Sequence, residues 1–370
     1  MILGIDASRA NQEQKTGVEW YAFFIIQNLK KIVPADWEVR LYTNQPLKGE
    51  LAELPPNWTE KVLGWPPRRL WTQVRLSWEM IRYTPDLLFV PAHVQPMIHP
   101  KKTILMVHDV AAKNTPGAYN RFEKWYSIWT AEEALQKLPA VIVPTEAVKA
   151  DLLNVFSKVQ SEKITVVHHG INPLFFETTS LDAAAVLSKN SVQKPFVLAV
   201  GRIEQKKNSV GLVKAFTRAV ELGYKGSLVF VGKPGFGYDE VEQVIKKSPV
   251  KNSITIIPWL ETPELVGLLR QADALVFPSM AEGFGLPVLE AMASGVPVIA
   301  SDLPVLREVG GNAAKYVLPT DTEAWAKAII ETAEPVHQAR LRMLGKVRAA
   351  EFSWEKAARK TWEIFQKIAL

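Results

Sequence analysis

Residues 274–302 read ALVFPSMAEGFGLPVLEAMASGVPVIASD, and this stretch decides the fold. It contains an apolar run (274–279), a loop with two glycines, a helix-forming segment that starts at Pro287, and a second apolar run (297–301). Pro is favoured at the first helical positions. Short apolar runs that are separated by a helix are typical of parallel strands buried on both faces. The stretch therefore predicts a strand, a loop, a helix and a second strand parallel to the first.

The same alternation extends over the chain on both sides of this stretch. Apolar runs predict strands in the first half at 1–6, 37–43, 86–91, 103–109, 140–145 and 163–169. In the second half they predict strands at 195–202, 227–232, 253–259, 274–279, 297–301 and 315–318. Amphipathic segments predict helices between several of them, at 18–32, 146–156, 209–223, 239–248 and 261–272. We therefore expect an α/β protein with two Rossmann-like doubly wound domains that face each other across a cleft.

The length of the chain also predicts two domains, because 370 residues exceed the usual size of a single core. We expect an N-terminal domain over 1–175, a weakly patterned linker over 176–194 and a C-terminal domain over 195–350. Residues 351–370 predict an amphipathic helix with Ser353 as its N-cap. We expect this helix to pack back towards the N-terminal domain.

Composition excludes several classes of protein. The chain is 48% hydrophobic and 22% charged, has no Cys, and carries a net charge of +6. Disulfides, thiolate metal sites and a Cys nucleophile are therefore excluded. No apolar run is long enough to span a bilayer, and residues 1–9 lack the features of a signal peptide, so the expected location is the cytoplasm. The six His include no HExxH motif, and we expect no metal site.

The loop after the strand at 274–279 predicts an anion site with a carboxylate on each side. A helix that begins after this loop presents free N–H groups at the carboxyl end of a strand, and Gly283 and Gly285 let the backbone approach a ligand closely. Glu282 and Glu290 could form an acid/base pair, a metal site, or the two ends of a cradle for one elongated ligand. A carboxylate one turn into a helix accepts hydrogen bonds from a sugar diol. We therefore favour the cradle, with a phosphate between the two glutamates.

A second loop supplies positive charge to the same site. Arg202 and Lys207 follow the strand predicted at 195–202, and two cations that face a helix N-terminus would bind a diphosphate and stabilise it as a leaving group. The sequence contains no Asp-x-Asp, the usual carboxylate anchor for Mg²⁺. We therefore expect the phosphates to be bound without a metal.

These motifs resemble those of retaining glycosyltransferases of family 4, which have the GT-B fold. The family's E-x7-E motif is matched by Glu282 and Glu290, and its G-R-x4-K element by Gly201, Arg202 and Lys207. The resemblance is most specific in this second half.

In the first half, TGVEWY (16–21) resembles the family's glycine loop, with Gly17 where many members have two glycines. VHD (107–109) resembles its HD-type motif after a strand, and the C-terminal FSWEKAARKTWEIF also resembles the family. The resemblance therefore covers the whole chain.

The resemblance implies an N-terminal acceptor domain, a C-terminal nucleotide-sugar domain, and roles for individual residues. Arg202 and Lys207 would bind the donor diphosphate, Glu290 the ribose and Glu282 the transferred sugar. The backbone of Gly283, Phe284, Gly285 and Leu286 would contact sugar and phosphate, and Gly201 and Gly17 would let the backbone approach the phosphates. His108 would contact the donor sugar near the reacting carbon. The catalytic residues implied are His108, Glu282, Arg202 and Lys207.

The implied reaction moves a hexosyl unit from a GDP-mannose or UDP-hexose donor to a hydroxyl of a glycan or lipid-linked glycan. It retains the anomeric configuration and uses no metal or other cofactor. The leaving phosphate assists the incoming hydroxyl, and the group that takes the proton stays open.

Four other functions compete with this interpretation. An NAD-dependent oxidoreductase would need a G-x-G-x-x-G after a strand, and the sequence has none. A sugar-nucleotide epimerase or hydrolase of similar two-domain fold stays open as an alternative, as does a non-catalytic nucleotide-binding scaffold. Nucleic-acid binding would need a dense basic stripe with aromatic platforms, whereas the basic residues here are scattered.

Residues 68–83 (RRLWTQVRLSWEMIRY) allow two interpretations. Arg68, Arg75 and Arg82 recur every seven residues, and Trp71 and Trp78 lie on another face. The segment could dock on an anionic membrane or on a lipid-diphosphate acceptor, with peripheral association at the inner face of the membrane. Alternatively, it is a surface helix packed by its tryptophans, with its one acidic residue, Glu79, paired with the arginines. The second interpretation is the simpler expectation.

Overall fold

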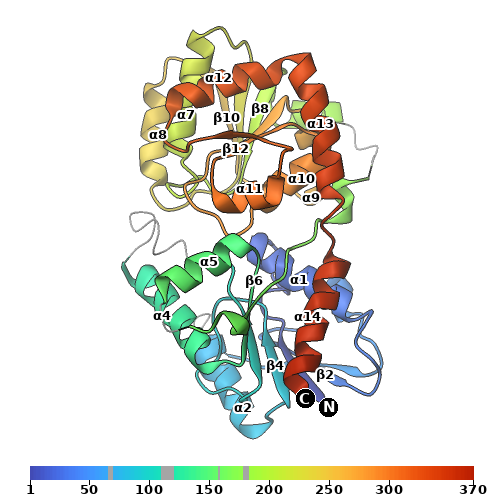
Figure 1. The fold of residues 1–370 in the computed structure, drawn as a ribbon. Helices are drawn as coiled ribbons and strands as arrows, with labels where there is room; N and C mark the ends of the chain where they lie inside the picture. The colour runs from blue at the N-terminus through green and yellow to red at the C-terminus, as the bar shows by residue number, and fades with distance from the viewer. Residues whose placement is uncertain (66–69, 110–120, 157–158, 178–182) are drawn as a thin grey trace. The chain divides into compact units, whose positions relative to one another are not determined.

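The computed structural model describes residues 1–65, 70–109, 121–156, 159–177 and 183–370. The chain divides into two compact units (Figure 1). The first contains the described residues up to Gly170 together with Ser353–Leu370, and the second contains Ile171–Phe352 apart from 178–182. Within the described residues, the chain leaves the first unit after Gly170 and returns to it at Ser353.

The first unit is built on a seven-stranded parallel sheet in the order β3-β2-β1-β4-β5-β6-β7. Its strands are β1 (Ile2–Asp6), β2 (Glu38–Thr43), β3 (Trp58–Val62), β4 (Leu87–Val90), β5 (Thr103–Met106), β6 (Ala140–Val143) and β7 (Ile164–Val166). Its helices are α1 (Gly17–Leu29), the π-helix η2 (Trp71–Leu76), α2 (Ser77–Arg82), α4 (Arg121–Lys137), α5 (Glu146–Val155) and α14 (Trp354–Ala369). The described part of this unit also contains the 3₁₀ turns η1 (Gly49–Ala52) and η4 (Ser161–Lys163).

The second unit is built on a six-stranded parallel sheet in the order β10-β9-β8-β11-β12-β13. Its strands are β8 (Phe196–Val200), β9 (Ser227–Val231), β10 (Ile254–Ile257), β11 (Ala274–Phe277), β12 (Val298–Ser301) and β13 (Lys315–Val317). Its helices are α6 (Ala183–Lys189), α7 (Ser209–Glu221), α8 (Tyr238–Lys247), α9 (Thr262–Gln271), α10 (Leu286–Ala293), α11 (Pro304–Gly310), α12 (Thr322–Ala333) and α13 (Pro335–Ala349). Its described residues also form the 3₁₀ turns η5 (Pro173–Phe175) and η6 (Lys251–Ser253).

The strand order confirms the expected pair of doubly wound α/β sheets. In the second unit the order reverses between β8 and β11, which pair directly through Ala274–Val197 and Leu275–Leu198. Ligands of doubly wound sheets bind at such a reversal, beyond the carboxyl ends of the strands. The loops that follow β8 and β11 are therefore where we expect a ligand site in this unit.

Burial of the strands explains why the sequence predicted most of them. All four residues of β11 are buried, as the apolar run at 274–279 implies. Strand β3 was not predicted: it lies at the edge of its sheet, and of its five residues only Trp58 is buried. The N-cap predicted for the last helix is confirmed, because the Ser353 hydroxyl accepts from the Lys356 N–H at 3.2 Å.

The segment expected as a linker, 176–194, differs from the prediction. Its Ala-rich part forms α6, which packs on α9 within the second unit and buries Val186. Alanine has the highest helix propensity, which accounts for a helix in a segment without a clear apolar period. Nowhere in the described ranges is a helix both long and apolar enough to cross a bilayer.

Candidate functional site

The loops after β8 and β9 approach each other so closely that only glycine fits. Gly201, directly after β8, has a φ of +132° and donates its N–H to the Val231 carbonyl at 2.9 Å. A Cβ built on Gly232, directly after β9, would lie 1.8 Å from the Gly201 carbonyl oxygen. Gly232 was not singled out from the sequence, since a glycine after a strand is common and its neighbour is distant in sequence. The two glycines hold the start of the loop that carries Arg202 and Lys207.

The structure pairs Lys207 with Glu282. The Lys207 ammonium donates to Glu282 Oε1 and stands 4.9 Å from the centroid of the Phe277 ring. The two side chains are 23% and 9% exposed, so the pair is largely shielded from water. A backbone bond from the Met280 N–H to the Lys206 carbonyl, at 2.8 Å, joins the same two loops. Two residues expected at one site are therefore in direct contact, and each neutralises the other in the absence of a ligand.

Arg202 lines the same small cavity as Lys207, but its guanidinium is engaged elsewhere. Arg202 Nε lies 3.4 Å from Glu204 Oε2, and the guanidinium also donates to the Pro234 carbonyl at 3.5 Å. Its side chain is 61% exposed, so the ion pair with Glu204 is weak and easily exchanged for a ligand. The cavity measures about 20 Å³, enough for about one water molecule.

Ser279 also lines this cavity and was not predicted as a site residue. It is 1% exposed, and its hydroxyl has no hydrogen-bond partner among the described residues. A buried hydroxyl without a partner is costly. The sequence offered no signal for it, since a Ser two residues after a strand is ordinary loop chemistry.

Helix α10 begins immediately after the glycine loop. Its N-cap, Gly285, has a φ of +91°, and a Cβ there would lie 2.7 Å from Leu306 Cδ2, so glycine is required on both counts. Pro287 has no N–H, and the Val288 N–H donates to the Gly285 carbonyl at 3.0 Å. Of the first three residues of α10, only Leu286 therefore keeps an N–H available for an anion.

The remaining two residues of the loop differ in their side chains. Phe284 is 5% exposed and packs edge-on against Phe352, with ring centroids 5.9 Å apart. Its side chain is therefore occupied by the fold, and its backbone is the part left for a ligand. Gly283 is also buried.

Glu290 lies one turn into α10, and its carboxylate makes no hydrogen bond or ion pair within the described part of the chain. Burial raises the pKa of Glu290 to about 7, because little water remains to solvate the charged form. A carboxylate that is poorly solvated and without a partner is suited to accept hydrogen bonds from a ligand's hydroxyls. Glu282 and Glu290 have different surroundings, one paired with a cation and the other not.

We expect Glu290→Gln to stabilise the ligand-free protein at pH 8, and to have little effect at pH 5. The pKa of Glu290 is about 7 in the folded chain against a reference of 4.5, so the folded state keeps a proton that the unfolded chain has released. The stability contributed by this group is thus present below about pH 4.5 and lost as the pH rises through 7. Gln has no charge to desolvate and should add about 1–3 kcal/mol at pH 8.

Urea unfolding at the two pH values measures this difference. Glu363→Gln, on the exposed side of α14, controls for the removal of a carboxylate from a helix. Equal effects of Glu290→Gln at pH 5 and pH 8 would contradict the assignment.

His108 lies in the first unit, in a cluster of aromatic rings. Its Nε2 donates to the Pro91 carbonyl at 3.1 Å, and its ring centroid lies 5.0 Å from those of Tyr21 and His93. Burial, with a smaller contribution from His93, lowers the pKa of His108 to about 3. The imidazole is therefore neutral at physiological pH and has an Nδ1 lone pair, so it accepts a hydrogen bond rather than donating a proton.

Gly17, also in the first unit, is the exposed first residue of α1. The Glu19 carboxylate accepts from the Thr16 N–H at 3.1 Å at this helix start. His169 is buried and stacks on Trp354, with ring centroids 5.7 Å apart.

Comparison with known proteins identifies the family of each half. Residues 15–174 match the model described as Glycosyltransferase Family 4, and residues 187–334 match the model described as Glycosyl transferases group 1. The O-antigen chain mannosyltransferase RfbU of Salmonella typhimurium is 28% identical over 270 residues, which are 73% of this chain and 70% of the relative.

Solved structures extend the likeness to the whole fold. Sucrose-phosphate synthase from Thermosynechococcus elongatus has a TM-score of 0.77 at 20% identity, covering 100% of this chain and 99% of that one. Anabaena Alr3699/HepE, solved in complex with UDP-glucose, has a TM-score of 0.75 at 16% identity and covers 99% of both chains. Family models match both halves of the chain, and solved structures match its full fold. This chain therefore belongs to the glycosyltransferases of the GT-B fold, with a family 4 N-terminal half and a group 1 C-terminal half.

Proposed function

We propose that this protein is a retaining hexosyltransferase that uses a nucleotide-diphosphate sugar without a metal ion. The observation that carries the proposal is the Lys207–Glu282 pair. It joins the loops after β8 and β11 at the reversal of the strand order, next to the start of α10. The cation and the helix N-terminus there match the diphosphate of such a donor, and the carboxylate matches its sugar hydroxyls.

The proposed roles follow from these surroundings. Lys207 exchanges Glu282 for the donor diphosphate, and Arg202 exchanges its exposed ion pair with Glu204 for the same phosphates. Glu282, released from Lys207, accepts hydrogen bonds from the transferred sugar, and Glu290 accepts from the ribose diol. The Leu286 N–H donates to a phosphate oxygen. Lys207, Arg202 and the Leu286 N–H stabilise the negative charge that grows on the leaving phosphate.

The proposed bond changes balance without a protein nucleophile. The bond between the sugar C1 and the phosphate oxygen breaks, and the acceptor hydroxyl oxygen bonds to C1 from the same face, so the anomeric configuration is retained. The acceptor proton passes to the leaving phosphate. His108, neutral because its pKa is about 3, would serve as a hydrogen-bond acceptor for the donor sugar and not as the acid.

For the substrates, we propose GDP-mannose as the first donor to test and a glycan or lipid-linked glycan as the acceptor. The relative RfbU is named as an O-antigen chain mannosyltransferase, which supports a mannosyl donor and a glycan acceptor. HepE binds UDP-glucose in its structure, which supports a UDP-hexose as the second donor to test.

A product assay tests the proposal. The protein is incubated with GDP-mannose or UDP-glucose, with mannosylated oligosaccharide acceptors, and with or without EDTA. We expect nucleoside diphosphate release that depends on the acceptor, is unaffected by EDTA, and yields a product with the donor's anomeric configuration by NMR. An isomerised or hydrolysed donor in the absence of acceptor would indicate the epimerase or hydrolase alternative instead, and an inverted product or a requirement for added Mg²⁺ would contradict the proposed mechanism.

A further inference from the structure

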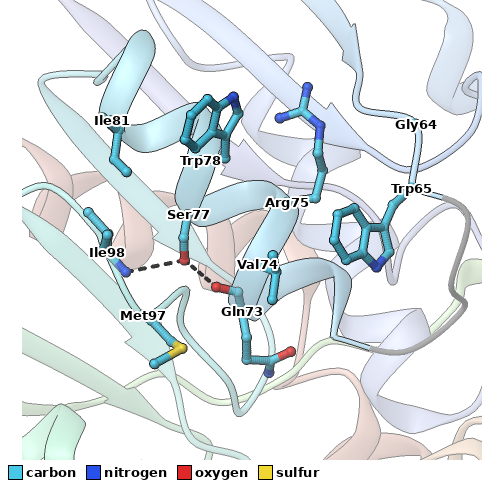
Figure 2. Close-up of a pocket in the computed structure, with 10 residues that line it drawn as sticks. All are labelled: Gly64, Trp65, Gln73, Val74, Arg75, Ser77, Trp78, Ile81, Met97 and Ile98. Carbon is cyan, nitrogen blue, oxygen red and sulfur yellow. Dashed lines mark hydrogen bonds between the residues drawn. The ribbon is translucent and has the colours of Figure 1, made fainter.

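The first unit contains an open hollow that uses none of the residues assigned above. It has a volume of about 810 Å³, within the range of small-molecule sites. Figure 2 shows that one wall comes from η2 and α2, and that Trp65, Met97 and Ile98 come from other segments. Its lining residues are Gly64, Trp65, Gln73, Val74, Arg75, Ser77, Trp78, Ile81, Met97 and Ile98.

Two of the polar groups that line this hollow are already engaged within the protein. The Ser77 hydroxyl donates to the Gln73 carbonyl at 2.5 Å and accepts from the Ile98 N–H at 3.2 Å, as the dashed lines in Figure 2 show. The Arg75 guanidinium donates to Glu79 at 3.0 Å. What the hollow mainly offers a ligand is therefore hydrocarbon and aromatic surface, which selects an apolar ligand.

The two tryptophans of this segment have opposite environments. Trp71 is 7% exposed and donates its indole N–H to the Leu63 carbonyl at 2.8 Å. This agrees with the expectation of a helix that packs on the protein through its tryptophans. Trp78 is 55% exposed, and so is Ile81 one turn later, so this part of the expectation is wrong. An exposed tryptophan costs free energy unless a partner covers it.

Exposed apolar side chains are concentrated in the part of the chain that forms the hollow. Eighteen large apolar side chains are exposed in the described part of the chain, and seven of these lie between residues 70 and 98. The seven are Leu70, Val74, Trp78, Ile81, Tyr83, Met97 and Ile98. Apolar patches of this kind mark surfaces that bind a partner or a membrane.

The stretch of sequence that carries this patch is basic. Residues 61–102 contain seven Lys or Arg and two acids, Glu79 and Asp86. Glu79 is paired with Arg75, and Asp86 accepts from the Ile2 N–H at 2.7 Å, so both acids are used within the fold. Arg82 is exposed beside the Tyr83 ring, 6.0 Å from its centroid. Arg68, the first member of the seven-residue repeat, lies outside the described residues.

We propose that this hollow takes up a hydrocarbon chain of an anionic lipid, so that this face of the first unit docks on a negatively charged bilayer. Apolar side chains that enter the boundary between headgroups and chains, with cations at the level of the headgroups, are the combination that binds such surfaces. The proposal stands on the first unit alone and is independent of the donor and reaction proposed above.

Co-sedimentation of the full-length protein with vesicles tests it. Vesicles of phosphatidylcholine with about 40% phosphatidylglycerol, an anionic lipid, are compared with vesicles of pure phosphatidylcholine. We expect the protein to bind the anionic vesicles. Salt at about 0.5 M should weaken this binding, because it screens the charges. Trp78→Gln with Ile81→Gln should lower this binding about tenfold or more, and Arg82→Gln should lower it about fivefold.

Matched variants separate the patch from general effects. Met343→Gln with Val347→Gln on α13 removes two side chains that are 64% and 66% exposed, and Arg340→Gln removes an exposed cation of the same helix. These variants should bind vesicles as the wild type does. Trp78→Leu keeps the apolar surface and should keep the binding, but should reduce the quenching of tryptophan fluorescence by lipids brominated on their chains.

Three results would overturn the proposal. The first is equal binding to pure phosphatidylcholine, and the second is an equal loss of binding in the α13 variants. The third is quenching by a dispersed brominated detergent without any vesicle binding, which would make the hollow a site for a soluble amphiphile. Unchanged melting temperatures of the variants show that lost binding does not come from unfolding.

Discussion

The Lys207→Met variant is expected to lose about 10²–10³-fold in kcat/KM with the best donor, the effect of removing one charged donor to a leaving group. Lys207 reaches the site from the loop after β8 and contacts Glu282 in the loop after β11. Methionine keeps most of the volume and packing against Phe277 and removes the charge. Lys214→Met, on the exposed face of α7, is the control and should keep full activity.

Stability separates the catalytic role of this pair from a structural one. Lys207→Met leaves the Glu282 carboxylate, 9% exposed, without its cation, which should cost about 1–3 kcal/mol in urea unfolding. Adding Glu282→Gln removes the unpaired charge and should restore most of that stability while leaving activity lost. If the double variant recovers both stability and activity, or if Lys207→Met alone retains activity, the pair serves only the fold.

Gly232→Ala is expected to have the second large effect, on stability and on nucleotide binding together. A Cβ at this position would lie 1.8 Å from the Gly201 carbonyl oxygen, and the backbone on both sides is held by neighbouring strands. Overpacking against side chains costs about 1–3 kcal/mol, and an overlap with backbone should cost at least about 3. Because Gly201 opens the loop that carries Lys207, we also expect nucleoside diphosphate affinity to fall about tenfold or more.

Gly267→Ala is the matched control for this substitution. Gly267 lies inside α9, and the nearest atom to an added Cβ is Val186 Cγ2 at 3.6 Å, an ordinary contact. Alanine there should stabilise the second unit by about 0.5–1 kcal/mol. Equal effects of the two Gly→Ala changes would refute the packing argument at Gly232.

The sequence was sufficient for most of the fold because most strands are buried on both faces. Strand β11, whose residues are all buried, reads as one apolar run, and the strands that pair with it read in the same way. Edge strand β3 could not be found by this rule, because Thr59, Lys61 and Val62 are exposed and the strand therefore has no continuous apolar run. Helix α6 was missed because its short alanine-rich segment has no apolar period.

The site was only partly predictable, for a topological reason. The expectation that Lys207 and Glu282 belong to one site came from their loops, and the structure brings them into contact across 75 residues of sequence. That contact depends on β8 lying beside β11, which local pattern does not specify. The contact of Arg202 with the Pro234 carbonyl and the burial of the Ser279 hydroxyl could likewise not be predicted, since both depend on neighbours from other loops.

Titration calorimetry of GDP and UDP against the wild type and Lys207→Met, each with and without EDTA, tests the central claim most directly. The claim is that the loops after β8 and β11 bind a nucleoside diphosphate through Lys207 without a metal. It predicts that at least one of the two nucleotides binds the wild type equally with and without EDTA, and that Lys207→Met weakens this binding about 10–100-fold. Absence of binding, binding that EDTA abolishes, or affinity that Lys207→Met leaves unchanged would contradict it.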